Sequence, residues 1–325
     1  MSQLRINPEL LHEFEAGLDP RFPEKSRVPT RVLGYGEIST VLEIGTGPDA
    51  EVAYKRLSMF RTEAEVDRYE ALHREYVTTL QDRIGLNLVP SETVRIVDPD
   101  RRKVVLYIVQ KRLPGETIGH KAIHFLTPAG IQKLLRAVLR EFTKIFQFNR
   151  ENGHELAVGF DGQISNWAID GFDPEARRLP EPIDLFYLDT STPLLQRQGK
   201  EQLNPDLFLR SAPSFLTWII RLLFLKDVMT RYYDLRRVAV DLIANFYKEQ
   251  LPDRIPDLIE VVNECLSAAW AEGAFAPISQ KEVRAYYRED ARIWRIYLAF
   301  RKLDRFLHGF VGKEYPYILP GRIQR

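Results

Sequence analysis

Residues 32–41 of the chain read VLGYGEISTV, and residues 52–57 read VAYKRL. Gly34 and Gly36 lie one residue apart among residues that favour strands, and Lys55 follows in the next apolar run. Such a pair of glycines suits a hairpin with unusual backbone angles, and it equally suits a turn whose N–H groups cover phosphates above a lysine. The stretch alone is compatible with both interpretations, so other parts of the chain must decide between them.

The composition is that of a folded protein with one large bilobal unit or two ordinary domains. The chain has 325 residues, of which 45% are hydrophobic, and its 46 Lys and Arg nearly balance its 45 Asp and Glu. The resulting charge of +1 gives no reason to expect nucleic acid or an anionic membrane as the main partner. The single cysteine, Cys265, excludes an internal disulfide.

No segment predicts a membrane span or a secretory signal. The N-terminal residues MSQLRINPEL lack an apolar stretch. The longest apolar stretch, FLTWIIRLLFL at 215–225, contains Arg221 and is too short to cross a bilayer. We therefore expect a cytoplasmic protein without a membrane span.

The pattern of the chain changes near residue 115. Before it, short β-rich segments alternate with turn residues, and one helical pattern at 62–83 interrupts them. After Leu113-Pro114-Gly115, amphipathic helical patterns dominate, and Thr127 is the expected cap of the first long helix. The predicted fold class is α+β and bilobal. Its parts are a small antiparallel β-sheet lobe with one helix (1–109), a hinge (110–115) and a large, mainly helical lobe (116–325).

Lys55 is the first candidate for a phosphate site. Apolar neighbours on its strand would direct its ammonium inward beneath the glycine turn, whereas a lysine at a strand end could also extend to solvent. The following helix supplies carboxylates that could hold this ammonium. Helical phase favours Glu70, and the spacing before Leu80 favours Glu75. We choose Glu75, and Glu70 stays as the alternative.

Two later loops contain further candidates. Asp161 and Asn166 lie in the glycine-containing loop VGFDGQISNW, where an aspartate can orient a hydroxyl or accept its proton, and an asparagine oxygen can bind magnesium. An ordinary Asp-Gly turn would explain the same loop. Asp189 ends the β-rich run IDLFYLD and could provide a second magnesium ligand, with Asp184 as a weaker candidate.

The order and spacing of these features resemble the protein-kinase-like superfamily, and especially its aminoglycoside-phosphotransferase and choline-kinase-like branch. The resemblance rests on several weak motifs that occur in the expected order on the expected elements. The residues that carry it are Gly34, Gly36, Ser39 and Val41 in the glycine-rich loop, Ala53 and Lys55 on the third strand, Gln110, Lys111 and Arg112 in the hinge, Asp161 and Asn166 in the catalytic loop, and Asp189.

The resemblance implies an ATP- and Mg²⁺-dependent transfer of a phosphoryl group to a hydroxyl of a small molecule. In this scheme Lys55 contacts the phosphates of ATP and pairs with the helix glutamate, while Asn166 and Asp189 bind magnesium. Asp161 acts as the base or orients the acceptor, and backbone groups of residues 110–112 meet the adenine. The expected partners are a nucleotide and a small-molecule acceptor, whose identity the sequence leaves open.

The chain also departs from this pattern. Gly159 stands two residues before Asp161, where the family usually has histidine, and Ser39 replaces the third glycine of the loop. Thr190 follows Asp189 in place of the usual phenylalanine. These differences favour an alternative, a pseudokinase that binds nucleotide or a partner without phosphoryl transfer. Nucleotide transfer in the same fold is a third alternative.

Two C-terminal segments allow more than one interpretation. Arg284, Arg288, Arg292 and Arg295 recur at helical spacing, and a solvated helix face explains them better than a substrate site does. The final residues, YPYILPGRIQR, are extended and proline-rich, and they could dock on the protein or bind a partner.

Overall fold

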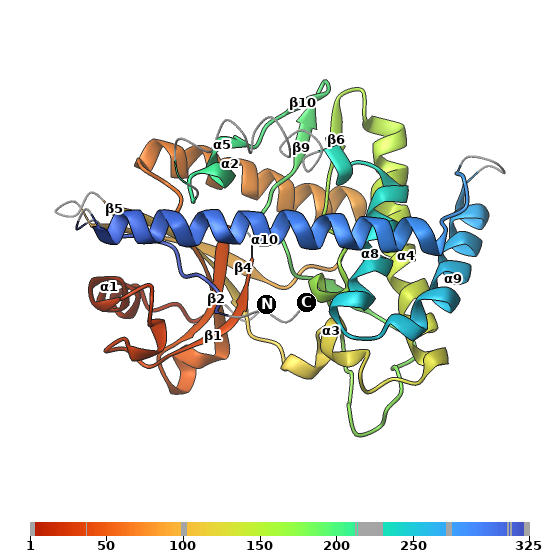
Figure 1. Cartoon of the computed structure of the whole chain (residues 1–325), viewed down its shortest axis with the longest axis horizontal. Helices are drawn as coiled ribbons and strands as arrows, with labels where there is room; N and C mark the ends of the chain where they lie inside the picture. Colours follow the sequence, from red (N-terminus) through yellow and green to blue (C-terminus); the bar gives the residue numbers. More distant parts are fainter. Residues whose placement is uncertain are drawn as a thin grey trace.

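The first sheet has five antiparallel strands in the order β1-β2-β3-β5-β4 (Figure 1). The computed structural model describes residues 4–36, 38–98, 103–211, 213, 230–270, 275–310, 312 and 314–321. The strands are β1 (Thr30–Tyr35), β2 (Ser39–Ile44), β3 (Val52–Leu57), β4 (Ser91–Asp98) and β5 (Lys103–Lys111). We call residues 30–111 the sheet region. The antiparallel sheet that the β-rich segments predict is confirmed.

Both faces of the sheet are covered at strands β3 and β5. Side chains alternate along a strand, so Leu106 of β5 packs with helix α2 (Glu63–Thr78), while Tyr107 packs with helix α1 (Pro8–Gly17) on the opposite face. A strand covered on both faces has no polar side to show to water. This double burial explains why β5 reads as the continuous apolar run VVLYIV.

Helix α2 matches the helical pattern expected at 62–83. The Thr62 side chain accepts a hydrogen bond from Glu65 N at 3.3 Å and begins the helix. After Thr78 the chain continues in one wider turn to Ile84, and Gly85 ends it with a positive φ of 80°.

The remainder of the chain is mainly helical, and we call residues 115–310 the helical region. The helices among its described residues are α3 (Gly119–Ala122), α4 (Pro128–Asn152), α5 (Asp206–Leu209), α8 (Leu235–Lys248), α9 (Ile255–Ala269) and α10 (Gln280–Phe310). Short strands between α4 and α5 are β6 (Leu156–Val158), β7 (Trp167–Ile169), β8 (Leu185–Tyr187), β9 (Leu195–Arg197) and β10 (Lys200–Glu201). The apolar faces of α4, α8 and α9 meet in the largest core. The apolar stretch at 215–225 lies outside the described residues.

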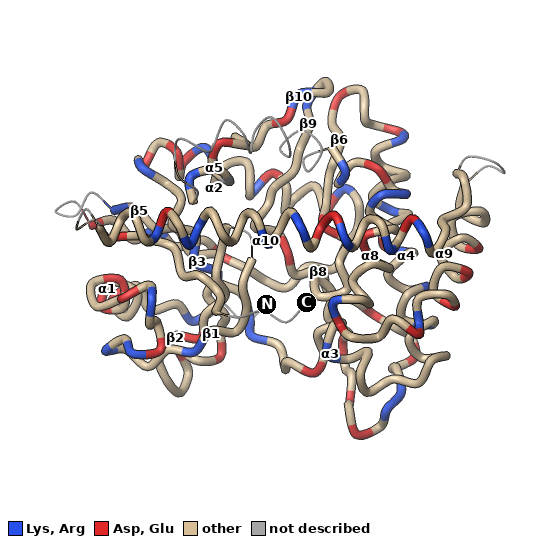
Figure 2. Tube along the Cα trace, viewed as in Figure 1, with Lys and Arg blue, Asp and Glu red and all other residues tan. Residues whose placement is uncertain are grey.

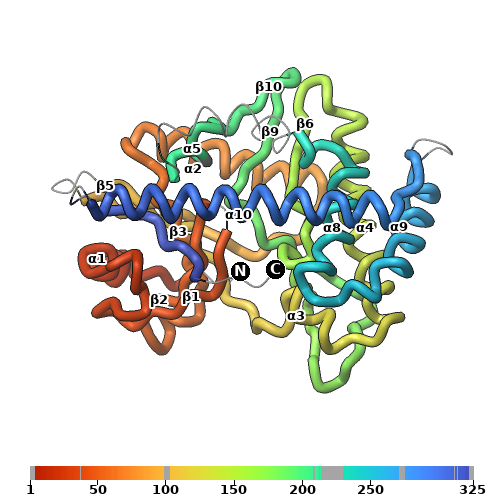
Figure 3. The backbone as a smooth tube through the Cα atoms, viewed as in Figure 1, coloured from red at the N-terminus to blue at the C-terminus, as the bar shows by residue number. Residues whose placement is uncertain are grey.

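Helix α10 and the segment after it connect the two regions. The helix follows the long axis of the molecule and passes in front of both regions in Figure 3. Tyr315, Tyr317 and Leu319 then pack on the sheet region in the core that includes Leu57. Of the two roles open for the C-terminal residues, docking on the protein is therefore observed for 315–319.

Within the part of the chain that the structure describes, no helix combines the length and the apolar character that a membrane crossing requires.

Candidate functional site

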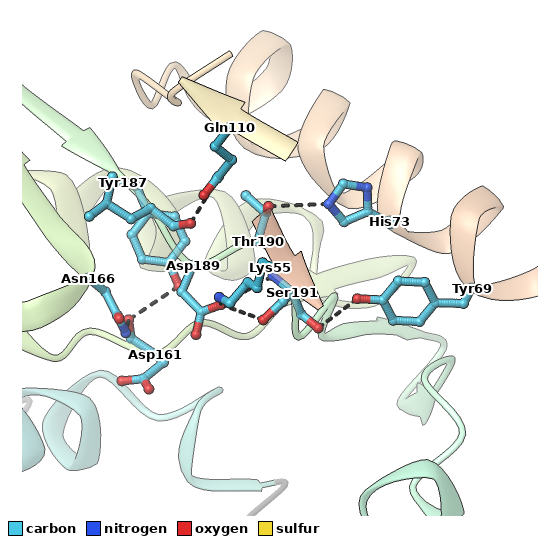
Figure 4. Close-up of polar contacts among 11 residues, drawn as sticks. Lys55, Tyr69, His73, Gln110, Asp161, Asn166, Tyr187, Asp189, Thr190 and Ser191 are labelled. Carbon is cyan, nitrogen blue, oxygen red and sulfur yellow. Dashed lines mark hydrogen bonds and ion pairs between the residues drawn. The ribbon is translucent and has the colours of Figure 1, made fainter. Parts of the chain in front are cut away.

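Lys55 lies on the central strand of the sheet and contacts Asp189. β3 pairs with β2 and β5, and Lys55 is opposite Val41 and Ile108 on these neighbours. Because side chains alternate, Lys55 is on the α2 side of the sheet and Arg56 is on the α1 side. The Lys55 ammonium lies 2.7 Å from Asp189 Oδ1, and both side chains are mostly buried (Figure 4).

A short hairpin brings the two expected magnesium ligands to the same place. β7 pairs antiparallel with β8, so Asn166, just before β7, and Asp189, just after β8, lie at the same end of the hairpin. Leu188 N donates to Asn166 O at 2.8 Å and fixes this end. Asp184 is exposed and precedes β8 at the other end. The hairpin geometry therefore selects Asp189 over Asp184.

The loop before β7 holds Asp161 beside Asn166. Asn166 Nδ2 and the Tyr187 hydroxyl both donate to Asp161 O, at 3.1 and 3.2 Å. The Asp161 carboxylate accepts from Gln163 N at 3.1 Å. Figure 4 shows Lys55, Asp161, Asn166 and Asp189 gathered at the junction of the sheet and the hairpin. Four candidates from distant parts of the sequence thus meet at one junction.

The pKa values of the two aspartates shift in opposite directions. Burial, and then the charges of Asp241 and Asp189, raise the pKa of Asp161 to about 8. Burial alone would also raise the pKa of Asp189, but the Lys55 ammonium and hydrogen bonds from Ser191 outweigh it and lower that pKa below its ordinary value. Asp189 is therefore a stable anion, and Asp161 is a group that can accept a proton near neutral pH.

Asp241 is a member of this site that the sequence analysis did not identify. It is buried on α8, and its Oδ2 accepts from Gln163 Nε2 at 3.2 Å, which ties α8 to the Asp161 loop. The available signal was a charged residue within the apolar run VAVDLIANF at 238–246, because such a residue is costly to bury unless it has a partner.

Gly159 stands where the family usually has histidine, and the structure leaves no room there for a side chain. A Cβ atom at Gly159 would lie 2.9 Å from the Tyr233 ring and 3.1 Å from Leu194 Cβ. The Gly159 carbonyl accepts from the Tyr76 hydroxyl of α2 at 2.9 Å. Two tyrosines therefore hold this part of the loop in the absence of histidine.

The glycine-rich residues form the turn between β1 and β2. Gly36 N donates to Ser39 O at 2.9 Å, and a Cβ on Gly36 would lie 2.7 Å from Ser39 Oγ, so glycine permits this close approach. Gly34 is paired with Val41, which in turn is paired with Lys55 on β3. The turn is thus aligned with the lysine across two strands.

Leu33 is a second residue that the sequence analysis missed. It lies at the β-bulge between Val32 and Gly34, and it is one of the large apolar side chains that remain exposed. An exposed leucine next to a glycine turn is available for contact with a ligand. Its position directly before the first glycine was the signal in the sequence.

The expected adenine contacts of residues 110–112 stay a prediction, and the structure shows which bonds these residues already make. Two of the three N–H donors of this segment bond to residues that precede neighbouring strands: Lys111 N donates to Pro90 O at 3.4 Å, and Arg112 N donates to Glu51 O at 2.9 Å. Gln110 Nε2 donates to Leu188 O at 3.2 Å and connects β5 to the hairpin. An adenine could use these backbone donors only by displacing the bonds that they already make.

The expected ion pair between Lys55 and Glu75 is wrong, and so is the alternative with Glu70. Glu75 pairs with Arg197, and Glu70 pairs with Arg95. The buried side of α2 is formed by its aromatic and aliphatic positions, and both glutamates lie beside that stripe. Lys55 has Asp189 as its partner.

The α2 side chains that do face the Asp189 loop are Tyr69 and His73. The Tyr69 hydroxyl donates to Ser191 O at 2.7 Å, and His73 Nε2 lies 3.2 Å from Thr190 Oγ1. Both residues are part of the helical spacing that predicts α2. The helical spacing places both residues on the buried face of α2, but it does not indicate that their polar ends contact the loop after Asp189.

We expect His73 to make the protein less stable at mildly acidic pH. Burial, followed by the positive charge of Lys55, lowers the pKa of His73 to about 4. Between the ordinary pKa of about 6.5 and pH 4, the unfolded chain binds a proton that the folded protein does not, so the free energy of unfolding falls as pH falls. This residue alone should lower it by about 2 kcal/mol between pH 7 and pH 5.

Urea unfolding at both pH values measures this effect. His73→Gln should lose less stability between pH 7 and pH 5 than the wild type does, and the matched variant His154→Gln, at an exposed position, should behave as the wild type. Equal pH dependence in the wild type and His73→Gln would contradict the assignment.

No curated protein sequence matches the chain. Among solved structures 43 chains match. One is WaaP in complex with acyl carrier protein, which has 12% sequence identity and a TM-score of 0.31, over 74% of this chain and 88% of that chain. The model of a family described as a family of unknown function, DUF6206, matches residues 24–305. The chain therefore belongs to the DUF6206 family.

Proposed function

We propose that the protein is an ATP- and Mg²⁺-dependent phosphotransferase with a bilobal, kinase-like fold, related to the aminoglycoside-phosphotransferase and choline-kinase-like branch. Its acceptor is a hydroxyl group of a small molecule. The observation that carries the proposal is the meeting of Lys55 with Asp189 at 2.7 Å, at the end of the hairpin that also holds Asn166 and Asp161. Phosphoryl transfer needs little more than such a cation, metal ligands and a base in fixed positions.

The strand and the turn supply the nucleotide side of this site. Lys55 binds the phosphates, and the turn that contains Gly34, Gly36 and Ser39 covers them with backbone N–H groups. Val41 and Ala53 flank the base from the sheet, and the exposed Leu33 adds a further apolar contact. Since Lys111 and Arg112 N–H groups are already bonded, apolar contact contributes more to adenine binding here than hinge hydrogen bonds do.

The donor groups fit magnesium. Magnesium in such sites usually has one or two carboxylate ligands, with nucleotide phosphates and water completing its shell. Asp189 provides an anionic oxygen, and Asn166 donates through Nδ2, which leaves its Oδ1 as an acceptor. Across the described residues no group of three His, Cys, Asp or Glu side chains could hold a metal by itself. The metal would therefore arrive with the nucleotide and would supply charge neutralisation of its phosphates.

In this scheme, nucleotide binding requires the ion pair between Lys55 and Asp189 to open. Lys55 now bonds to Asp189, so both groups must exchange partners when phosphates and magnesium bind. Ser191 donates to Asp189 Oδ1 through N and Oγ at 3.2 and 2.8 Å, which helps to hold the carboxylate in place during that exchange.

A specific observation favours a second function, that of a pseudokinase-type binding module. Neither α2 glutamate pairs with Lys55, and Lys55 instead neutralises a proposed metal ligand. A protein that has lost phosphoryl transfer could keep this closed ion pair as a structural contact.

Turnover of ATP separates the two functions. The purified full chain is incubated with ATP, Mg²⁺ and a panel of amino sugars, sugars and amino alcohols, and ADP is measured together with AMP and pyrophosphate. Phosphoryl transfer predicts acceptor-dependent ADP that is absent in Asp189→Asn, whereas AMP and pyrophosphate would indicate nucleotide transfer. If ATP binds but no reaction forms ADP, AMP or pyrophosphate, the result would support the pseudokinase function.

A further inference from the structure

The outer face of α10 has an unusual distribution of charge. The helix has 31 residues, which corresponds to a length of about 46 Å. Its exposed basic residues are Lys281, Arg284, Arg288, Arg292, Arg295 and Lys302, and its one exposed acidic residue is Glu289. At about 100° per residue, these positions all lie on one side of the helix. Figure 2 marks the basic positions along α10 in blue and the acidic positions among them in red.

Apart from the exposed Glu289, the acidic residues of α10 are buried or paired with residues outside the helix. Asp290 pairs with Lys248 at 3.3 Å and lies 3.7 Å from Arg231, and Glu282 pairs with Arg236 of α8. Among the described residues, no ion pair joins Arg284, Arg288 or Arg292 to an acidic side chain. A chain with a net charge of +1 therefore carries a concentrated positive field on one face.

The same face ends in large apolar side chains. Phe306 is 69% exposed and Phe310 is 83% exposed, and Leu303 and Leu307 are also exposed. Their spacing places them on the side of the helix that carries the arginines. Residues of these types are usually buried, so a contiguous exposed group of four marks a contact surface.

We propose that the outer face of α10 binds the surface of an anionic phospholipid bilayer. Arginines along the helix meet lipid phosphates, while Phe306 and Phe310 insert between the head groups, so the helix lies on the membrane without crossing it. Charge complementarity selects this occupant. A second copy of the chain would bring an equally basic face to the contact, which like-charge repulsion disfavours. The proposal is independent of the phosphotransferase function.

Flotation of the full-length protein with lipid vesicles tests this proposal. Vesicles of phosphatidylcholine alone are compared with vesicles that contain phosphatidylglycerol, at low and high salt. We expect binding to the anionic vesicles only, and weaker binding at high salt. Phe306→Ser with Phe310→Ser, and separately Arg288→Gln, Arg292→Gln and Arg295→Gln together, should each weaken binding by about tenfold or more.

Matched controls are available at other exposed sites. Phe22→Ser removes an exposed phenylalanine elsewhere, and the triple change Arg177→Gln, Arg178→Gln and Lys200→Gln removes three exposed charges away from α10. Both controls should bind as the wild type. Because every altered residue is exposed, circular dichroism should show unchanged folding in all variants.

Three outcomes would overturn the proposal. One is absence of binding to anionic vesicles at low salt. Another is equal binding by the wild type and both α10 variants. The third is a wild-type dimer in sedimentation that the Phe306→Ser, Phe310→Ser variant converts to monomer while vesicles bind neither form, which would assign the face to self-association.

Discussion

Glu15→Gln is expected to lower the free energy of unfolding by about 3–5 kcal/mol, the typical cost of leaving a buried charge unpaired. Glu15 of α1 is 5% exposed and Arg56 of β3 is 3% exposed. Arg56 donates to both carboxylate oxygens, at 2.7 and 3.0 Å, and Lys103 lies 2.9 Å away. Burial alone would raise the pKa of Glu15, yet these cations lower it to about 2, so the carboxylate is strongly held as an anion.

The cost is large because the same network fixes both ends of the chain to the sheet. Arg56 also donates to Pro316 O at 2.7 Å, so the pair connects α1, β3 and the segment after α10. Urea unfolding measures the change. The matched control is Glu13→Gln on the same helix, where an exposed pair with Arg27 should contribute less than about 1 kcal/mol. Equal losses in Glu15→Gln and Glu13→Gln would contradict this account.

Asp161→Asn is expected to reduce phosphoryl transfer by about 10²–10⁴-fold while leaving the affinity for Mg²⁺-ATP nearly unchanged. The substitution keeps the shape of the side chain and removes its ability to accept a proton. Asp161 is not one of the proposed metal ligands. The affinity for Mg²⁺-ATP depends instead on Lys55 and Asp189, which the substitution leaves unchanged. The rate with the best acceptor and a nucleotide-binding titration, measured on the same sample, separate the two effects.

The pH dependence gives an additional check on Asp161. Burial and the charges of Asp241 and Asp189 raise its pKa to about 8, and only the ionised carboxylate accepts a proton. The wild-type rate should therefore increase as pH rises toward about 8. Asp170→Asn, at an exposed position after β7, is the control and should keep the wild-type rate. An Asp161→Asn enzyme with full rate would exclude the role of base.

The sheet and the hairpin were predictable because their sequence patterns are local. Short β-rich runs separated by turn residues indicate β1 to β5, and the runs ISNWAI and IDLFYLD indicate the two strands of the hairpin. Lys55 was identifiable because a lysine within an apolar strand needs a partner. The antiparallel pairing of β7 with β8 then explains why two residues far apart in sequence lie at the same end.

The partners of these residues were not predictable because they depend on tertiary packing. Helical phase could not distinguish glutamates beside the buried stripe of α2 from those on it, so Glu75 was chosen although its partner is Arg197. The N–H groups of Lys111 and Arg112 are bonded to residues that only the folded sheet brings near. Asp241 belongs to a helix that begins some 70 residues after the Asp161 loop, a separation that no local pattern spans.

Asp189 and Lys55 are proposed to form a site for nucleotide and magnesium. The most direct test is the free energy of unfolding with and without Mg²⁺-ATP, measured for the wild type, Asp189→Ala and the control Asp170→Asn. At a ligand concentration 100 times the dissociation constant, binding to the folded state alone should add about 2.7 kcal/mol in the wild type and in the control. This gain should require magnesium and should be lost in Asp189→Ala. No gain in the wild type at millimolar Mg²⁺-ATP, or the same gain in Asp189→Ala, would contradict the proposal.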